Sequence, residues 1–210
     1  MRMFRLMGLI TVLGCTAMAQ SWEAGVTVGG GFYSTSDLTS SVGTAAATWS
    51  KNLAGSVWVG KSTSGHFGGE VRYDYQRGNM DLSQGATRAN FRADSQAIHY
   101  DMLWHFTDSE STIRPFVSAG GGIKAYRGTG NETAFQPLSK IALLTKATDT
   151  VPLISIGAGI KARISDHVQL RLEVHDFITP FPTQTFTPVN AKGANWVHDI
   201  VPAVGLAFLF

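Results

Sequence analysis

The sequence has almost no cysteine. Cys15 is the only one among 210 residues, and it falls within the first nineteen residues, which have the composition of an export signal. A chain that loses this segment has no thiol and forms no disulfide. That suits a protein that crosses an oxidising compartment in the unfolded state, where free thiols can mispair.

The first nineteen residues are predicted to be a signal peptide. Arg2 and Arg5 precede a short apolar stretch, and Ala17-Met18-Ala19 supplies the A-x-A pattern that signal peptidase recognises. We therefore predict a signal peptide over residues 1–19, cleavage before Gln20 and a single mature domain over residues 20–210. Val12-Leu13-Gly14-Cys15 also loosely resembles a lipoprotein box, so a lipidated Cys15 remains the alternative.

The mature chain has no excess of charge of either sign. Removing Arg2 and Arg5 from the 17 Lys and Arg of the whole chain leaves 15, which equals the 15 Asp and Glu. A nucleic-acid-binding surface needs clustered basic residues in excess, so nucleic acid is not expected as a partner.

The mature chain also lacks a long apolar run, so no transmembrane helix is predicted. Helical periodicity is nearly missing, whereas alternation with a period of two recurs, as in β-strands. In residues 67–76, Phe67, Val71 and Tyr73 share one face, while Glu70 and Arg72 share the other. The same pattern predicts eight strands, at about 22–33, 53–62, 66–76, 93–106, 113–126, 151–164, 167–177 and 198–210.

The connections between these segments alternate in length. Those at 63–65, 107–112 and 165–166 are short, whereas four are long and rich in Gly, Ser, Thr or Pro: 34–52, 77–92, 127–150 and 178–197. Outer-membrane barrels have tight periplasmic turns and long outer loops. We therefore predict an all-β fold, a closed antiparallel up-and-down transmembrane barrel of eight strands with both termini in the periplasm.

A soluble barrel also alternates, and the placement of the aromatic residues argues against that alternative. Aromatic residues are expected to gather at the two interfaces of a bilayer, whereas a soluble core gives no reason for two belts. The periplasmic belt is predicted to comprise Trp22, Phe67, Trp104, Phe106, Phe208 and Phe210, and the outer belt Phe32, Tyr33, Tyr73, Tyr75, Tyr126, Phe177 and Trp196.

Three segments carry a resemblance to a known family. The chain ends in alternating apolar residues and a terminal Phe210, residues 114–122 read RPFVSAGGG, and residues 170–177 read LRLEVHDF. These segments are similar to the OmpA/OmpX-like outer-membrane β-barrel family, although His175 stands where that family more often has Arg. The resemblance implies location in a Gram-negative outer membrane, contact with its lipids and lipopolysaccharide, and insertion by periplasmic chaperones and the barrel-assembly machinery.

Two G-x-G-x-x-A matches begin at Gly120 and Gly157. A dinucleotide site needs a helix after this motif, and each match lies instead in a predicted strand, so no cofactor is expected. As a repeat they are more informative. Ser118, Gly120, Gly122 and Lys124 correspond to Ser155, Gly157, Gly159 and Lys161, and all eight are expected to face the lumen, where the glycines leave room for long side chains from the opposite wall.

Histidines are the remaining candidates for chemistry. His99, Asp101 and His105 share the inward face of one predicted strand, and His175 and His198 stand near Asp176 and Asp199. A His/Asp pair beside a serine would suit a hydrolase, but no serine follows His175, and no pair of ligands has a zinc spacing. We therefore assign no catalytic, cofactor-binding or metal-binding residue and expect no enzyme.

The predicted lumen faces carry near-balanced charge, which favours mutual pairing across an interior that eight strands leave just wide enough for side chains. The expected function is a structural or surface-interaction role, adhesin-like, with a filled lumen. A narrow channel for small solutes is the alternative, and an outer-membrane lipid hydrolase is the third. The predicted lumen acids are Glu23, Glu70, Asp74, Asp101, Glu173 and Asp199, and the bases are Arg72, Lys124, Lys161, Arg163 and Arg171.

The two last outer loops are candidates for contact with a surface ligand. Residues 138–146 are compatible with a short amphipathic turn of helix, and the fourth loop places Phe181 and Phe186 among prolines. Exposed apolar loops bind partners. The alternative is that these side chains pack against each other.

Overall fold

The computed structural model describes residues 22–50, 52–62, 65–193 and 196–210. The predicted signal peptide and Cys15 lie outside the described residues. Every regular element within them is a β-strand, and they contain no helix that is long and apolar enough to cross a membrane.

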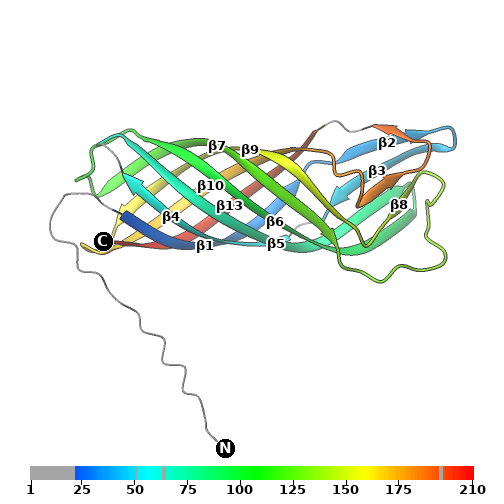
Figure 1. Ribbon diagram of the computed structural model, residues 1–210, viewed down its shortest axis with the longest axis horizontal. Helices are drawn as coiled ribbons and strands as arrows, with labels where there is room; N and C mark the ends of the chain where they lie inside the picture. Colours follow the sequence, from blue (N-terminus) through cyan, green and yellow to red (C-terminus); the bar gives the residue numbers. More distant parts are fainter. Residues whose placement is uncertain (1–21, 51, 63–64, 194–195) are drawn as a thin grey trace, which may run out of the picture.

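Eight long strands form a closed antiparallel ring (Figure 1). Each strand of the ring pairs with the next one along the chain, and the first pairs with the last. The backbone N–H groups of Trp22 and Phe210 each donate to the other residue's carbonyl, at 3.0 and 2.9 Å. The ring consists of β1 (Trp22–Tyr33), β4 (Asn52–Ser62), β5 (Phe67–Gln84), β6 (Thr87–His105), β7 (Ile113–Gly128), β9 (Thr148–Arg163), β10 (Val168–Pro180) and β13 (Trp196–Leu209). The eight predicted strands and the up-and-down order are confirmed.

Five short strands extend the barrel beyond one end of this ring, where Figure 1 shows β2, β3 and β8 together. We call this part the extension. Part of it continues the sheet of the wall, because Ala46 to Trp49 pair with Met80 to Ser83 in the outer part of β5. The segments Ala142–Leu144 and Phe186–Pro188 pair with each other in a separate two-stranded sheet. The strands are β2 (Ser36–Ser40), β3 (Gly43–Trp49), β8 (Ala142–Leu144), β11 (Phe186–Pro188) and β12 (Lys192–Gly193).

The prediction of loops at 34–52 and 77–92 is therefore wrong, because most of both segments is β-strand. Strands β5 and β6 run on as one hairpin to a two-residue turn, in which Gly85 adopts a φ of 57° that disfavours other residues. Met80 and Phe91 alternate with polar neighbours along this hairpin and are buried. An apolar inner face keeps the strands paired well past the ring.

An apolar cluster fills the inside of the extension. Trp49 lies at its centre, with ring centroids 4.7 Å from Tyr126 and 4.8 Å from Phe186. Phe181 and Phe186 of the fourth loop are 7% and 0% exposed, so they pack inward as the alternative for these loops predicts. No helix forms over 138–146. Leu138 has a φ of 64°, which begins a turn that leads into β8.

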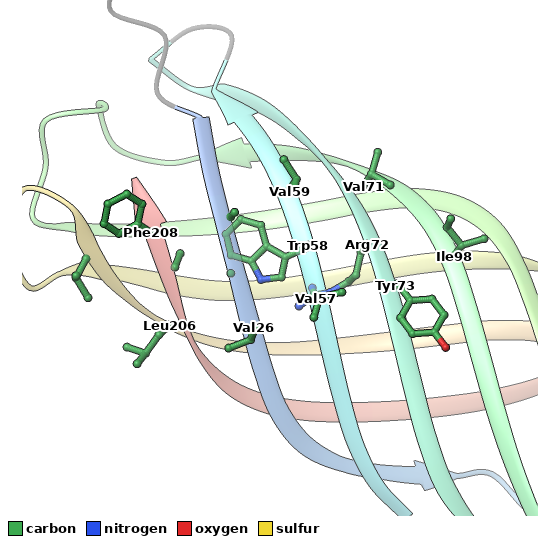
Figure 2. A pocket seen from close by; sticks show the side chains of 14 residues that line it. Val26, Val57, Trp58, Val59, Val71, Arg72, Tyr73, Ile98, Leu206 and Phe208 are labelled. Atoms are coloured by element: carbon green, nitrogen blue, oxygen red, sulfur yellow. The ribbon is translucent and has the colours of Figure 1, made fainter. Parts of the chain in front are cut away.

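The ring itself has the opposite arrangement, with polar side chains inside and apolar side chains outside. Along β5, Glu70, Arg72 and Asp74 are buried, while Val71 and Tyr73 are exposed, as predicted. Figure 2 shows part of the outer surface, where valines of β1, β4 and β5 meet Leu206 and Phe208. A polar interior with an apolar exterior is the reverse of a soluble barrel and is typical of a membrane barrel.

The aromatic belts are confirmed at one end and thinner than predicted at the other. All six residues of the predicted periplasmic belt are exposed, and Phe67 and Trp104 stack at 6.3 Å. At the outer end, Tyr33, Tyr126 and Phe177 point inward, because their strand positions share the parity of the lumen residues. The outer belt is left with Phe32, Tyr73, Tyr75 and Trp196.

Candidate functional site: the barrel interior

Buried charged side chains gather in the interior of the ring. Ten of the eleven predicted lumen charges are buried there. Arg163 is the exception, because it has the inward parity of Lys161 but is only partly buried. It is the last residue of β9, where the wall ends, and its guanidinium donates to the Ser109 carbonyl in a short turn at 2.8 Å.

Two arginines and two glutamates from facing walls form the centre of this interior. Arg171 of β10 donates to both oxygens of Glu70 of β5, at 2.6 and 2.8 Å, and to Glu173 at 2.5 Å. Arg72 donates to Glu173 and lies 3.4 Å from Glu70. Each guanidinium therefore bridges both carboxylates. A buried charge is tolerated when it is paired and hydrogen-bonded in this way.

Aromatic rings and a second ion pair cover the central group on its periplasmic side. The Arg171 guanidinium carbon lies 4.5 Å from the Trp58 ring centroid and 4.7 Å from that of Phe116. Lys161 donates to Glu23 and lies 5.6 Å from the Phe116 centroid. Planar guanidinium groups stack well on aromatic faces, so these rings fill space and stabilise the charge together.

A histidine–carboxylate cluster lies next to the central group. His99 contacts Asp101 through Nδ1 at 2.9 Å and Asp74 through Nε2 at 2.8 Å. The shared inward face of His99, Asp101 and His105 is confirmed, but His105 stands apart and contacts the His66 carbonyl. Both ring nitrogens of His99 are engaged, which fixes the ring.

The structure places a serine beside His175, a contact that the sequence does not reveal. Ser155 Oγ lies 3.4 Å from His175 Nδ1 and donates to Asp101 at 3.2 Å. These are the residue types of a nucleophilic hydrolase. However, Ser155 is 0% exposed, and the cavity beside His175 has a volume of only about 10 Å³, room for about one water. A substrate has no access to this serine.

The outermost polar level is built around Lys124. Its ammonium donates to Asp199 at 2.5 Å, and Gln76 donates to the same carboxylate oxygen at 2.6 Å. The ammonium also lies 4.8 Å from the Tyr33 centroid and 5.3 Å from that of Phe177. These aromatic rings join the polar interior to the apolar cluster of the extension.

The second predicted His/Asp group divides between two faces of the wall. Asp199 faces inward, whereas His198 faces outward and contacts Asp176 at 2.8 Å. The described residues contain no group of His, Cys, Asp and Glu side chains arranged to hold a metal ion.

The repeated glycines leave room for other residues, as predicted, but these residues belong to the adjacent strands of the sheet. A Cβ on Gly122 would lie 2.6 Å from the Cα of His99, and one on Gly159 would lie 2.7 Å from the Phe116 ring. Both contacts come from the adjacent strand and not from the opposite wall as expected. The glycines let these large side chains turn into the lumen.

Comparisons with known proteins agree with this architecture. Residues 7–195 match the family described as outer membrane protein beta-barrel domain. A search of curated protein sequences finds no match. Among solved structures, neisserial surface protein A has a TM-score of 0.53 at 12% identity, covering 91% of this chain and 97% of that one. The outer membrane protein OprG of Pseudomonas aeruginosa has a TM-score of 0.56 at 12% identity, covering 91% and 95%.

The fold and the two faces of its wall define an integral outer-membrane β-barrel. The chain belongs to the outer membrane protein beta-barrel domain family, and its location is the bacterial outer membrane. The periplasmic turns of such barrels are the short ones. The extension therefore stands at the outer surface, and the membrane lipids and lipopolysaccharide surround the wall.

Proposed function

We propose that this protein is a closed barrel with a structural and surface-interaction role, and that it neither conducts solutes nor catalyses a reaction. The observation that carries the proposal is the filling of the interior at two successive levels. Paired charges occupy the ring around Glu70 and Arg171, and apolar side chains occupy the extension around Trp49.

The same observation argues against the two alternatives. A narrow channel needs a continuous polar path, whereas the apolar cluster around Trp49 covers the outer end of the polar interior. A lipid hydrolase needs a nucleophile that the membrane or the surface can reach, and Ser155 is fully buried. The buried Ser155–His175 contact is better explained as part of the lumen network.

The extension offers a surface for a partner. Phe135 and Val42 are 79% and 54% exposed at its tip, beside a hollow that Gln84 and Leu138 also line. Exposed apolar groups at the end of a rigid stalk suit contact with another surface. During biogenesis, periplasmic chaperones and the barrel-assembly machinery are the proposed partners, with Phe210 as part of the terminal recognition signal.

Two assays test this proposal. Proteoliposomes containing the protein should take up arabinose or glycine no faster than empty liposomes, and faster uptake would contradict the closed barrel. For the surface role, adhesion of expressing cells should fall with the pair Val42→Ser and Phe135→Ser. It should not fall with Ile164→Ser, which alters an exposed apolar residue in a short turn at the opposite end. Equal adhesion of all three strains would contradict the surface role.

A further inference from the structure

Two arginines and an aspartate form a row across the outer wall just beyond the apolar band. On β5, Arg77 is the next outward residue after Tyr75, and it pairs in register with Asp94 of β6. Asp94 pairs in turn with Arg127 of β7. All three side chains point outward, at the height where the lipid-facing surface becomes polar.

A polar hollow lies directly beyond this row. Its volume is about 340 Å³, and its lining includes Asn90, Arg92, Thr129 and Asn131. The backbone is held in place here, because the N–H groups of Thr129 and Gly130 donate to the Arg92 carbonyl at 2.8 and 3.2 Å. Guanidinium, amide and hydroxyl groups thus meet in one concave surface.

The positive charge of this region is only partly compensated. Arg127 Nε lies 4.0 Å from Asp94 Oδ1, a long contact, and the Arg127 side chain is 48% exposed. Arg77 and Arg92 are exposed as well. A second carboxylate, that of Asp81, accepts a hydrogen bond from Asn90 at the edge of the hollow. Three guanidinium groups against these two carboxylates still leave a net positive surface at the depth of the lipid headgroups.

The arginines are confined to one side of the barrel. On the described residues of the other five ring strands, the outward positions at the outer end of the apolar band carry neither Lys nor Arg. These positions are Phe32, Leu53, Thr148, Pro180 and Trp196. A general girdle for anchoring the barrel would surround it, so confinement to β5, β6 and β7 is typical of a localised site.

We propose that Arg77, Arg92 and Arg127 form a binding site for the phosphorylated headgroup of an outer-leaflet glycolipid. The guanidinium groups bind phosphate through paired N–H donors. The hollow lined by Asn90, Thr129 and Asn131 takes sugar hydroxyls, while Tyr75 and Ile98 below it contact the acyl chains. The site lies outside the lumen, so it stands independently of the proposed closed-barrel function.

In the test, the full barrel is held in detergent-free nanodiscs and lipid A is supplied in phosphatidylcholine vesicles. The measured quantity is the amount of lipid A that binds to the barrel. Phosphorylated lipid A should bind the wild type, and each of Arg77→Gln, Arg92→Gln and Arg127→Gln should weaken binding about fivefold. Arg88→Gln removes the same charge nearer the tip of the same hairpin, where Arg88 pairs with Ser83, and it should change binding less than twofold. Heat-modified gel migration checks that every variant is folded.

Two further measurements distinguish the phosphate of a lipid headgroup from free inorganic phosphate as the ligand. Dephosphorylated lipid A should bind the wild type no better than it binds a variant that combines Arg77→Gln, Arg92→Gln and Arg127→Gln. Inorganic phosphate at millimolar concentration should displace little of the phosphorylated lipid. Equal binding of phosphorylated and dephosphorylated lipid would overturn the proposal. So would equal losses in Arg88→Gln and Arg127→Gln, or full displacement by inorganic phosphate, which would indicate a site for a free anion.

Discussion

Arg171 and Glu70 face each other across the lumen from β10 and β5 and form a two-point hydrogen-bonded ion pair at 2.6 and 2.8 Å. These strands are separated in the ring by β4, β1 and β13. The pair therefore ties together two walls that share no backbone hydrogen bonds. It is the central connection of the filled interior.

Removing one partner of this pair should destabilise the barrel strongly. Arg171→Ala leaves Glu70 and Glu173 with less compensation in the interior, and we expect a loss of about 3–5 kcal/mol in the free energy of unfolding. Urea unfolding in detergent micelles measures it. Arg163→Ala is the matched control, because Arg163 binds only a turn carbonyl, and it should cost less than about 1 kcal/mol. Equal costs for the two variants would contradict the buried network.

The lipid-facing wall should reject charge. Val71 is 52% exposed on the outward face of β5, so Val71→Arg should cost about 2–4 kcal/mol if it lies near the bilayer midplane. Thr44→Arg in the exposed hairpin of the extension should be nearly neutral. Refolding into phosphatidylcholine vesicles under a urea titration compares the two, and equal tolerance would argue against lipid contact at Val71.

The lumen glycines should resist even a methyl group. A Cβ on Gly122 would lie 2.0 Å from the Ile98 carbonyl oxygen, so Gly122→Ala should cost about 1–3 kcal/mol through overpacking. At Gly55 the nearest atom to such a Cβ is a carbonyl oxygen 3.7 Å away, and Gly55→Ala should be close to neutral. Thermal unfolding of both variants tests the difference, and a silent Gly122→Ala would show that the wall adjusts freely there.

The outward pair of His198 and Asp176 should contribute to stability on the membrane side of the wall. Their side chains are 49% and 32% exposed and lie 2.8 Å apart. His198→Ala removes the partner of Asp176 within the apolar band, below Pro180 and Trp196 at its outer end. We expect a loss of about 1–2 kcal/mol in the unfolding free energy measured in bilayers. His167→Ala, in a short turn at the opposite end of the barrel, should cost less. A smaller effect at His198 than at His167 would contradict this role for the pair.

Most of the fold could be predicted from the sequence, because the side chains of each wall strand alternate with a period of two. One face of the strand contacts lipid and the other faces the lumen. Phe67 to Gln76 shows this alternation without interruption, whereas the terminal strand alternates large outward residues such as Leu206 and Phe208 with small inward ones such as Gly205 and Ala207. The extension does not follow from the sequence, because its strands lie among Gly, Ser and Thr, which are typical of loops. The buried alternation of Met80, Leu82 and Phe91 was the signal that marks this hairpin as strand.

The sequence predicts which residues face the interior, but it does not predict which of their side chains pair with one another. Alternation assigns Glu70 and Arg171 to the lumen, yet their pairing depends on the tilt and register of a closed ring. The contact of Ser155 with His175 depends on the same geometry. The position of Tyr126 and Phe177 near the strand ends favours the outer belt, whereas the parity of these residues in their strands places them inside.

Single-barrel conductance tests the central claim most directly, because a filled interior and a narrow pore differ in whether ions pass. The wild-type protein, inserted into a planar lipid bilayer in symmetric salt, should show no steady current above the bare membrane. Arg171→Ala should show at most brief openings as the pairing around Glu70 loosens. A stable, voltage-independent conductance of the wild type would contradict the account, since it would mean that the paired charges line a path for ions and do not fill it.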